Sequence, residues 1–281
     1  MLTAIKPSSF NRIIPASCYH RNFYTLPNQV TDLQKELCAI VRKFVKTELP
    51  GSVVEKIDKE DKAPTHKLFS KMGELGLHGV MAPPEYGGLG LGYTEHCLIV
   101  EQISRGCPAL GLAYGAHSNL CMNQIIRNCN ESQKQKYLPK LISGEHIGAL
   151  AITEPDAGTD AFAMRTTAKK SKDGSHYVLN GTKTFITNAG VADTYVIYAK
   201  TRPELGSRGI SCFVVDKNTP GLSCGPKFEK LGMHGCETRQ VIFENCKVPA
   251  INLVGKENGG DAIMKLGLNS ERLVLSAGPL G

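Results

Sequence analysis

The chain has 281 residues, of which 41% are hydrophobic and 21% are charged. This composition is typical of a globular protein, and the length allows about two domains with cores of their own. The formal net charge is +7, but the sequence contains no dense basic stripe, which argues against nucleic-acid binding. A mildly basic surface suits an anionic small molecule instead. No apolar run reaches the ~20 residues of a membrane span, so none is expected.

Ten cysteines are spread along the chain without a Cys-x-x-Cys pair. Neither a metal site nor a redox dithiol is therefore expected. A secreted disulfide framework is also not expected, because the chain can form a core and carries no signal-peptide h-region. The cysteines are predicted to be reduced and mostly buried.

The N-terminal segment has a composition of its own. Residues 1–31 contain Lys6, Arg12 and Arg21 but no acidic residue. This composition is typical of a mitochondrial presequence, and residues 1–30 are predicted to be a transit peptide. A disordered terminus is the alternative interpretation.

Residues 31–146 carry the apolar periodicity of a helical domain. Thr31 is a good N-cap, and Pro50 closes the first helical pattern. The further helices are predicted at 64–75, 93–105, 109–127 and 131–142. The Gly-rich loop 82–92 does not fit Gly-x-Gly-x-x-Gly, so a dinucleotide fingerprint is rejected. His117 and Asn123 are interpreted as hydrogen-bonded core groups, with a ligand role as the alternative.

From Ile147 onward, short β-branched runs separated by turns replace the helical spacing. Strands are predicted at 177–179, 184–187, 195–200, 210–216 and 240–243. Turns are predicted at Asp173-Gly174, Asn180-Gly181, Asn188-Ala189-Gly190 and Pro220-Gly221. This spacing suggests an antiparallel barrel or sandwich. A last helix is predicted from Asp261 to Leu280.

Where the two halves meet, an apolar run ends abruptly in Thr-Glu-Pro-Asp-Ala-Gly-Thr (153–159). Pro155 presets φ, and Gly158 tolerates positive φ and close approach of a ligand. With the hydroxyls of Thr153 and Thr159, such a turn can hold a polar ring edge or a phosphate. From these residues alone an ordinary β-turn is an equally good interpretation.

Three motifs together resemble the acyl-CoA dehydrogenase family: Thr-Glu-Pro-Asp-Ala-Gly-Thr-Asp (153–160), Asn-Gly-Thr-Lys-Thr-Phe-Ile-Thr-Asn (180–188), interpreted as a hairpin, and Gly-Met-His-Gly (232–235). The resemblance runs in unbroken order from Val30 to Gly281. Two further stretches, 114–121 and 270–275, resemble the members that act on isovaleryl-CoA.

The resemblance implies an α+β multidomain fold with an all-α domain (31–146), a middle antiparallel β-barrel (147–256) and the first helix of a truncated C-terminal helical bundle (257–281). It also implies an FAD enzyme of the mitochondrial matrix, tetrameric in the family. Such an enzyme oxidises the Cα–Cβ bond of a short branched acyl-CoA, isovaleryl-CoA to 3-methylcrotonyl-CoA in leucine catabolism. It passes the electrons to electron-transferring flavoprotein.

The site residues follow from the motif positions. The resemblance implies that Glu271 is the catalytic base. An apolar site would raise the pKa of its carboxyl group and make it a stronger base near pH 7. Phe185 stands where the family usually has Trp, but it can still stack on a ring face. The implied flavin contacts are Leu150, Ala151, Ile152, Thr153, Glu154, Pro155, Asp156, Ala157, Gly158, Thr159, Phe185, Ile186 and Thr187. The implied substrate contacts are Thr159, Ser207, Arg208, Asn269, Ser270 and Arg272.

Two other interpretations stay open. One is a truncated, catalytically inactive isoform or fragment, because the rest of the C-terminal bundle would complete the flavin pocket and most of the tetramer contacts. The other is an oxidase-like flavoprotein, which differs in whether oxygen reaches the reduced flavin.

Overall fold

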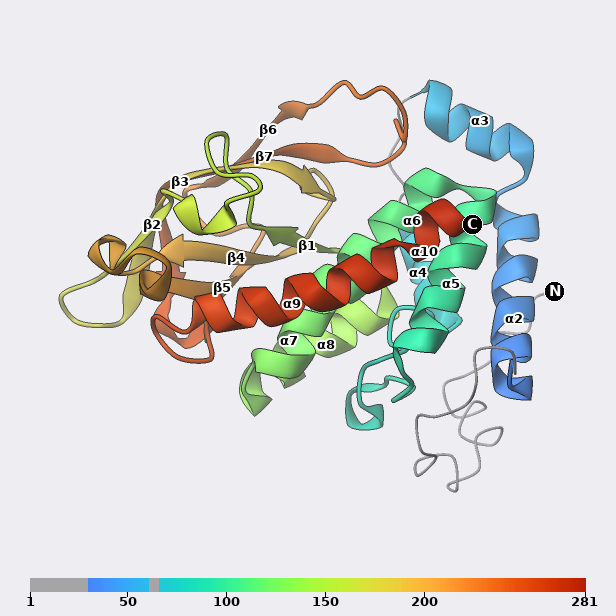
Figure 1. Cartoon of the computed structure of the whole chain (residues 1–281), viewed down its shortest axis with the longest axis horizontal. Coiled ribbons are helices and arrows are strands. Elements are labelled where there is room, and N and C mark those ends of the chain that lie inside the picture. The colour runs from blue at the N-terminus through green and yellow to red at the C-terminus, as the bar shows by residue number, and fades with distance from the viewer. Residues whose placement is uncertain (1–29, 61–65) are drawn as a thin grey trace.

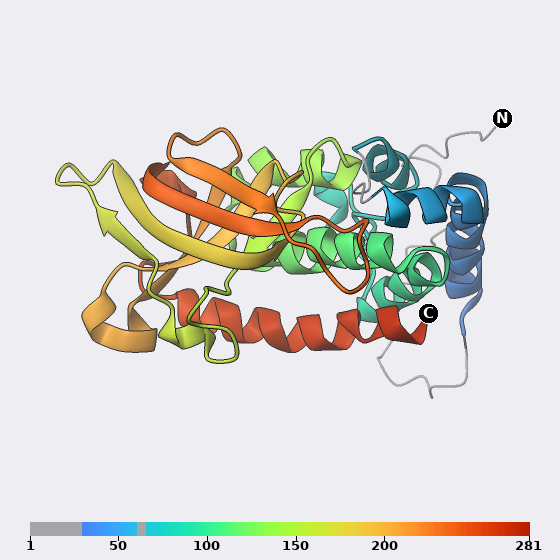
Figure 2. The ribbon, with the colours of Figure 1, turned by 90° about the horizontal axis from the view of Figure 1, so that it is seen from above.

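A computed structural model describes residues 30–60 and 66–281. The predicted transit peptide and the predicted helix start at Pro64-Thr65 therefore lie outside the described residues, except for Val30. A helical part and a β-sheet lie side by side, and α9 runs along both of them (Figures 1 and 2). No helix in the described ranges is long and apolar enough to cross a membrane.

The helical domain agrees with the predicted pattern. Its α-helices are α2 (Asp32–Glu48), α3 (Gly51–Lys59), α4 (His66–Glu74), α5 (Tyr93–Gly106), α6 (Pro108–Gly115), α7 (Met122–Asn128) and α8 (Glu131–Ser143). The sequence pattern does not predict helix α3, because Pro50 both closes the preceding helical pattern and is the N-cap of α3. A short 3-10 helix, η2 (Pro84–Tyr86), lies within the predicted Gly-rich loop.

Local capping explains where two of these helices begin. The Thr31 side chain accepts a hydrogen bond from the Gln34 N–H, and Gln34 reaches back to the Thr31 N–H. Asn130 and Gln133 form the same reciprocal capping box at the start of α8. Each box pairs two backbone N–H donors at the start of the helix that would otherwise have no acceptor.

The predicted helix 109–127 is interrupted in its middle. Residues Ala116–Cys121 form a π-helical segment, η3, between α6 and α7. The apolar composition predicted burial correctly, but it contains no signal for the wider turn. Segments of this kind are frequent at functional sites.

The β-domain is one sheet of eight strands: β1 (Gly148–Ala151), β2 (Thr167–Lys170), β3 (His176–Thr187), β4 (Thr194–Lys200), β5 (Ile210–Asp216), β6 (Leu222–Lys227), β7 (Thr238–Pro249) and β8 (Leu253–Val254). The order is β6-β7-β3-β2-β4-β5-β8, with β1 paired to β4. Most pairs are antiparallel as predicted, but β1 and β2 each pair with β4 in parallel. The sheet is therefore mixed.

The predicted turn at Asn180-Gly181, and with it the predicted hairpin 180–188, is wrong. Residues 180–187 lie within the continuous strand β3. The pairing of β3 with β7 shifts register between Leu179 and Gly181, and Gly181 has φ 144°. A Cβ on Gly181 would lie 2.4 Å from the Thr166 hydroxyl oxygen. Glycine is therefore needed here because the strand bulges and because the Thr166 side chain lies against it. An Asn-Gly dipeptide alone does not distinguish such a bulge from a turn.

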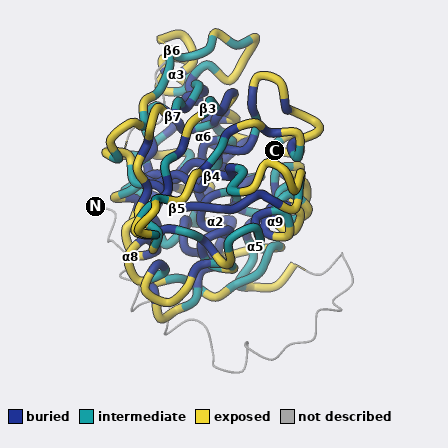
Figure 3. The backbone as a smooth tube through the Cα atoms, turned by 90° about the vertical axis from the view of Figure 1, so that its left-hand side faces the viewer, coloured by how far each residue is buried: buried dark blue, intermediate teal, exposed yellow. Residues whose placement is uncertain are grey.

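Helix α9 (Gly260–Leu275) is followed directly by the short helix α10 (Ala277–Leu280), so the predicted last helix is present in two pieces. Its first turn packs on β5, where a Cβ on Gly260 would lie 2.8 Å from the Ser211 carbonyl carbon. Further along it packs on α5, α6 and α7. Buried backbone is concentrated in the centre of the molecule, whereas the loops are exposed (Figure 3).

The nine cysteines in the described ranges are free thiols, as predicted, and seven of them are buried. Cys18 lies outside those ranges. His117 and Asn123 are hydrogen-bonded groups of the interior, which confirms that interpretation. The Asn123 amide donates to the Tyr93 hydroxyl at 3.1 Å.

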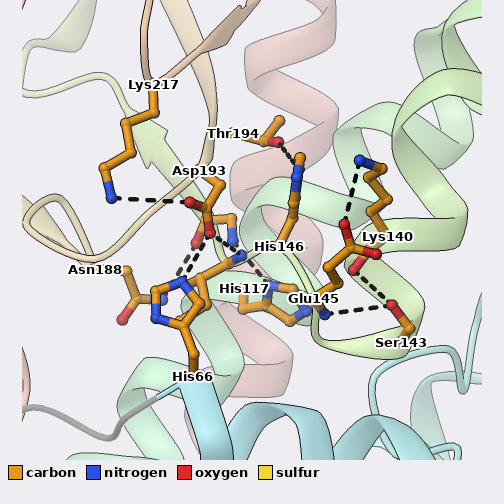
Figure 4. Close-up of polar contacts among 12 residues, drawn as sticks. His66, His117, Lys140, Ser143, Glu145, His146, Asn188, Asp193, Thr194 and Lys217 are labelled. Atoms are coloured by element: carbon orange, nitrogen blue, oxygen red, sulfur yellow. Dashed lines mark hydrogen bonds and ion pairs between the residues drawn. The ribbon is translucent and has the colours of Figure 1, made fainter.

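Polar side chains join the helices to the sheet at the start of β1 (Figure 4). The Gly148 N–H donates to Nδ1 of His117 at 2.9 Å, so His117 carries its proton on Nε2 and donates it to the Leu141 carbonyl at 3.0 Å. Asn188 donates to the Ala113 carbonyl at 2.9 Å and to the Gly148 carbonyl at 3.2 Å. Asp193 accepts from the Ile147 N–H at 3.0 Å. We call this group of contacts the β1 joint.

Three buried histidines lie together in the helical domain. The rings of His78 and His117 are 4.4 Å apart, and His96 shares a hydrogen bond with Ser118. Burial lowers the pKa of His78 to about 4 and that of His96 to about 3. It also lowers the pKa of His117 well below the ordinary value. All three are therefore neutral at pH 7.

The free energy of unfolding is expected to decrease as pH falls from about 6.5 toward about 4. In this window the unfolded chain binds protons that the folded histidines exclude, so stability is fully present above the ordinary pKa and is lost on acidification. Each histidine contributes up to about 1.4 kcal/mol per pH unit. Urea unfolding at several pH values measures the slope. A His176→Gln variant, which removes a half-buried histidine at the start of β3, is the control. A pH-independent free energy would contradict the prediction.

Candidate active site

Strand β1 leads directly into the 150–159 turn. Glu154 and Ala157 exchange two backbone hydrogen bonds, of 3.0 and 3.1 Å, which close the turn around Pro155. In the described structure the N–H groups of Thr153, Gly158 and Thr159 have no hydrogen-bond partner. A Cβ on Gly158 would meet no atom within 4 Å. The turn therefore presents unpaired donors on an open side, as a ligand-binding turn requires.

The side chains of the turn point in two directions. Pro155, Asp156, Gly158 and Thr159 are exposed, and Leu150 and Thr153 are half-buried. The remaining members of the predicted flavin contacts in this segment are buried, namely Ala151, Ile152, Glu154 and Ala157. Those four can meet a ligand on the open side through backbone atoms only.

Glu154 is turned inward and forms an ion pair with Lys183 of β3. The Lys183 Nζ lies 2.8 Å from Oε1 of Glu154 and 3.0 Å from the Ile152 carbonyl oxygen. The backbone N–H groups of Arg165 and Thr166 also donate to the carboxylate. Burial acts to raise the pKa of Glu154, but Lys183 and these donors outweigh it and hold the pKa below its ordinary value.

Phe185 lies on β3 close to this turn. Its side chain is 64% exposed, which is unusual for so large an apolar group. Its φ is 56°, a left-handed value that costs a non-glycine residue about 1 kcal/mol or more. The Phe228 ring lies 5.1 Å away. Of the neighbouring predicted contacts, Ile186 is buried in the core and Thr187 is half-buried.

An exposed aromatic ring, open backbone donors and a glycine without neighbours fit a flat aromatic ligand with polar edges. The ring can stack on a planar group, and the unpaired N–H groups can donate to its heteroatoms or to phosphate oxygens. These residues therefore fit a flavin nucleotide. The sequence did not single out two residues that contact the candidate flavin site. Phe228 lies beside the Phe185 ring. Lys183 contacts the turn, and the only sequence sign of this is a lysine at an inward-facing position of a strand.

Glu271 lies on α9 and is half-buried. No hydrogen bond or ion pair is recorded for its carboxylate within the described residues. Burial raises the pKa of Glu271 to about 7, although the neighbouring Arg272 acts to lower it. Glu271 also acts electrostatically on the buried Tyr198, whose pKa is raised well above its ordinary value mainly by burial. A carboxyl group in this state can accept and release a proton near neutral pH.

The predicted substrate contacts occupy three places. Ser270 accepts a hydrogen bond from Arg127 at 3.2 Å, while Asn269 and Arg272 are exposed on the same helix. Ser207 and Arg208 belong to the 3-10 segment η5 (Pro203–Gly209), which contacts both α9 and η4 (Ala161–Ala163). Since η4 follows the 150–159 turn, η5 connects α9 with the segment next to that turn.

Two family descriptions match the chain: "Acyl-CoA dehydrogenase, N-terminal domain" over residues 31–145 and "Acyl-CoA dehydrogenase, middle domain" over residues 149–246. The helical domain, the mixed sheet and the trailing helix agree with these matches. The chain belongs to the acyl-CoA dehydrogenase family.

Among curated relatives, the chain is 51% identical over 257 residues to the mitochondrial isovaleryl-CoA dehydrogenase of Pongo abelii, covering 90% of this chain and 60% of the relative. It is 46% identical over 276 residues to the mitochondrial 2-methylacyl-CoA dehydrogenase of Solanum tuberosum, covering 95% and 66%. The chain thus spans about 60% of the length of the first of these relatives.

Two solved structures have the same fold as this chain. An acyl-CoA dehydrogenase from Bacillus anthracis complexed with FAD is 35% identical with a TM-score of 0.83, covering 90% of this chain and 43% of that one. A chain from work on the electron transferring flavoprotein of Acidaminococcus fermentans is 40% identical with a TM-score of 0.86, covering 90% and 66%.

Replacing Phe185 by glycine is expected to change the free energy of unfolding by less than about 1 kcal/mol. The variant loses the contact with Phe228, but it also relieves the left-handed backbone conformation, so the two effects oppose each other. Urea unfolding of the chain without added ligand measures the difference. A Phe213→Ala variant in the fully buried core should lose about 3–5 kcal/mol. A comparable loss at Phe185 would show that its ring serves the core.

Proposed function

We propose that the protein is an FAD-dependent acyl-CoA dehydrogenase that forms a double bond between Cα and Cβ of a short branched acyl-CoA. The observation that carries the proposal is Glu271, a half-buried carboxyl group with a pKa of about 7 on the helix that runs along the sheet with the flavin-fitting turn. Family membership and the relatives' names support it. The activity of the whole protein is a proposal, because the chain spans about 60% of the first relatives' length.

The mechanism assigns separate tasks to separate elements. The Glu271 carboxylate takes the α-proton of the thioester, and its raised pKa makes it a stronger base than an exposed carboxylate. The 150–159 turn and Phe185 would hold FAD, which when bound supplies the acceptor for the hydride from the β-carbon. Thr159, Ser207, Arg208, Asn269, Ser270 and Arg272 would contact the acyl-CoA. Arg208 and Arg272 carry charge that suits its phosphates.

The substrate is proposed to be isovaleryl-CoA, giving 3-methylcrotonyl-CoA in leucine catabolism. The support is the 51% identity to an enzyme of that name. A 2-methyl-branched acyl-CoA is the second candidate, since a relative at 46% identity is named for it. Electron-transferring flavoprotein as electron acceptor, a tetrameric assembly and the mitochondrial matrix are proposed on the same basis. A catalytically inactive form is the alternative function, and anaerobic flavin reduction distinguishes the two.

Flavin reduction by isovaleryl-CoA is expected to depend on pH through Glu271. Only the carboxylate can accept the α-proton, so the rate should fall about tenfold per pH unit below about 7 and level off above it. Anaerobic bleaching of the visible flavin absorbance, with excess FAD present, measures this rate. A pH-independent rate would contradict the assignment of the base. Absence of bleaching with either branched substrate would favour the inactive form.

The variant Glu271→Gln should slow bleaching by about 10²–10⁴-fold while FAD remains bound. Glutamine keeps the size of the side chain but cannot accept the proton. Glu244→Gln, which removes an exposed carboxylate of β7, is the matched control and should reduce the flavin at the wild-type rate. Unchanged reduction in Glu271→Gln would rule out this residue as the base.

A further inference from the structure

Lys183 is a fully buried ionisable group without a task in the proposed reaction. It is 0% exposed, and its ammonium contacts the Glu154 carboxylate, the Ile152 carbonyl oxygen and, at 3.7 Å, the Met164 sulfur. Burial lowers the pKa of Lys183 to about 8, with the Glu154 charge acting in the opposite direction. Replacing a buried ion pair with apolar residues is often neutral for stability, so stability alone does not explain this pair.

The position of the ammonium relative to the turn is specific. Its two oxygen partners belong to the residues immediately before and after Thr153. The Thr153 carbonyl oxygen itself accepts the N–H of Thr184 at 2.8 Å. Two adjacent residues of β3 thus fix three consecutive residues of the turn. The next residue of β3 is Phe185, whose exposed ring forms the other part of the flavin-fitting surface.

We propose that Lys183 is a positioning residue, which holds the 150–159 turn at a fixed place relative to the Phe185 ring so that both contact the same planar ligand. The identity of that ligand as FAD rests on the proposed function. The geometric part of the proposal does not, because it concerns contacts between β3 and the turn. Replacing a residue that only stabilises the fold would weaken ligand binding only where it also weakens folding. Replacing a positioning residue can weaken ligand binding while the unfolding temperature stays unchanged.

Three variants of the full chain separate these roles. Lys183→Met removes the ammonium and leaves Glu154 with its two backbone donors. Lys183→Met with Glu154→Gln removes both charges and keeps one acceptor oxygen, for the N–H of either Arg165 or Thr166. The matched control is Lys170→Met, which removes the lysine of an exposed ion pair with Glu257 in the same sheet. Each variant is measured for thermal unfolding, for FAD affinity, and for hydrogen exchange of the Thr184 N–H without FAD.

The double variant is expected to unfold near the wild-type temperature, because no unpaired buried charge remains. Its FAD dissociation constant should still rise about tenfold or more, and its Thr184 N–H should exchange about tenfold faster, while amides of β4 stay protected. The single variant should show the same changes together with a lower unfolding temperature. Lys170→Met should resemble the wild type in all three measurements.

Wild-type FAD affinity and wild-type Thr184 exchange in a folded double variant would overturn the proposal. If the wild-type chain binds no FAD but Thr184 exchange accelerates in the variant, the proposed function fails and the positioning role stands. If the wild type binds no FAD and exchange is unchanged, both fail. If FAD affinity weakens without any change in exchange, Lys183 acts on the ligand by its charge, and the positioning role is overturned.

Discussion

The β1 joint is the constraint on which the arrangement of the candidate site depends. One short strand carries the 150–159 turn, and its first residue, Gly148, is held by His117 from the helices and by Asn188 from the sheet. A Cβ at Gly148 would lie 2.7 Å from the Cys121 sulfur, so the strand and η3 are in close contact. The helical domain, whose helices pack on α9 and its Glu271, is therefore held at a fixed position relative to the turn.

The polar groups of the interior differ in how well they are paired. In the joint, His117, Asn188 and Asp193 all have hydrogen-bond partners. By contrast, neither amide atom of Asn119 in η3 has one within the described residues, although the residue is buried. An unpaired buried polar group costs about 1–3 kcal/mol. Since η3 packs on both β1 and α9, this cost is located in a segment that contacts the strand of the turn and the helix of the proposed base.

The sequence predicted the elements whose signals are local. The start of α2 follows from capping by Thr31, and β4 and β5 follow from short runs that contain β-branched residues. It did not predict features that depend on tertiary contacts. Asn180-Gly181 has a turn composition, yet pairing with β7 on one side and contact with Thr166 on the other make it a bulge. The parallel pairing of β1 with β4 likewise has no local signal.

For the candidate site, the motif positions predicted the 150–159 turn, Phe185 and Glu271 as contacts, but they did not separate inward from outward side chains. Glu154 belongs to the same motif as Thr153 and Gly158, and only the fold shows that it faces Lys183. The sequence did not indicate that Lys183 contacts the turn, because its two partners there lie about thirty residues away in sequence. Side-chain direction at a turn is decided by the packing that surrounds it.

Glu154 and Glu271 carry the same carboxyl group, but their environments shift its pKa in opposite directions. Glu154 is nearly as buried as a side chain can be, but an ammonium and two backbone donors keep it charged, so its proton affinity is low. Glu271 is less buried, yet it has no recorded hydrogen-bonding partner in the described residues, and its pKa rises to about 7. Opposite shifts of this kind distinguish the carboxylate held in an ion pair from the one proposed to transfer protons. Exchanging the two environments would exchange the roles, because the carboxyl chemistry is the same.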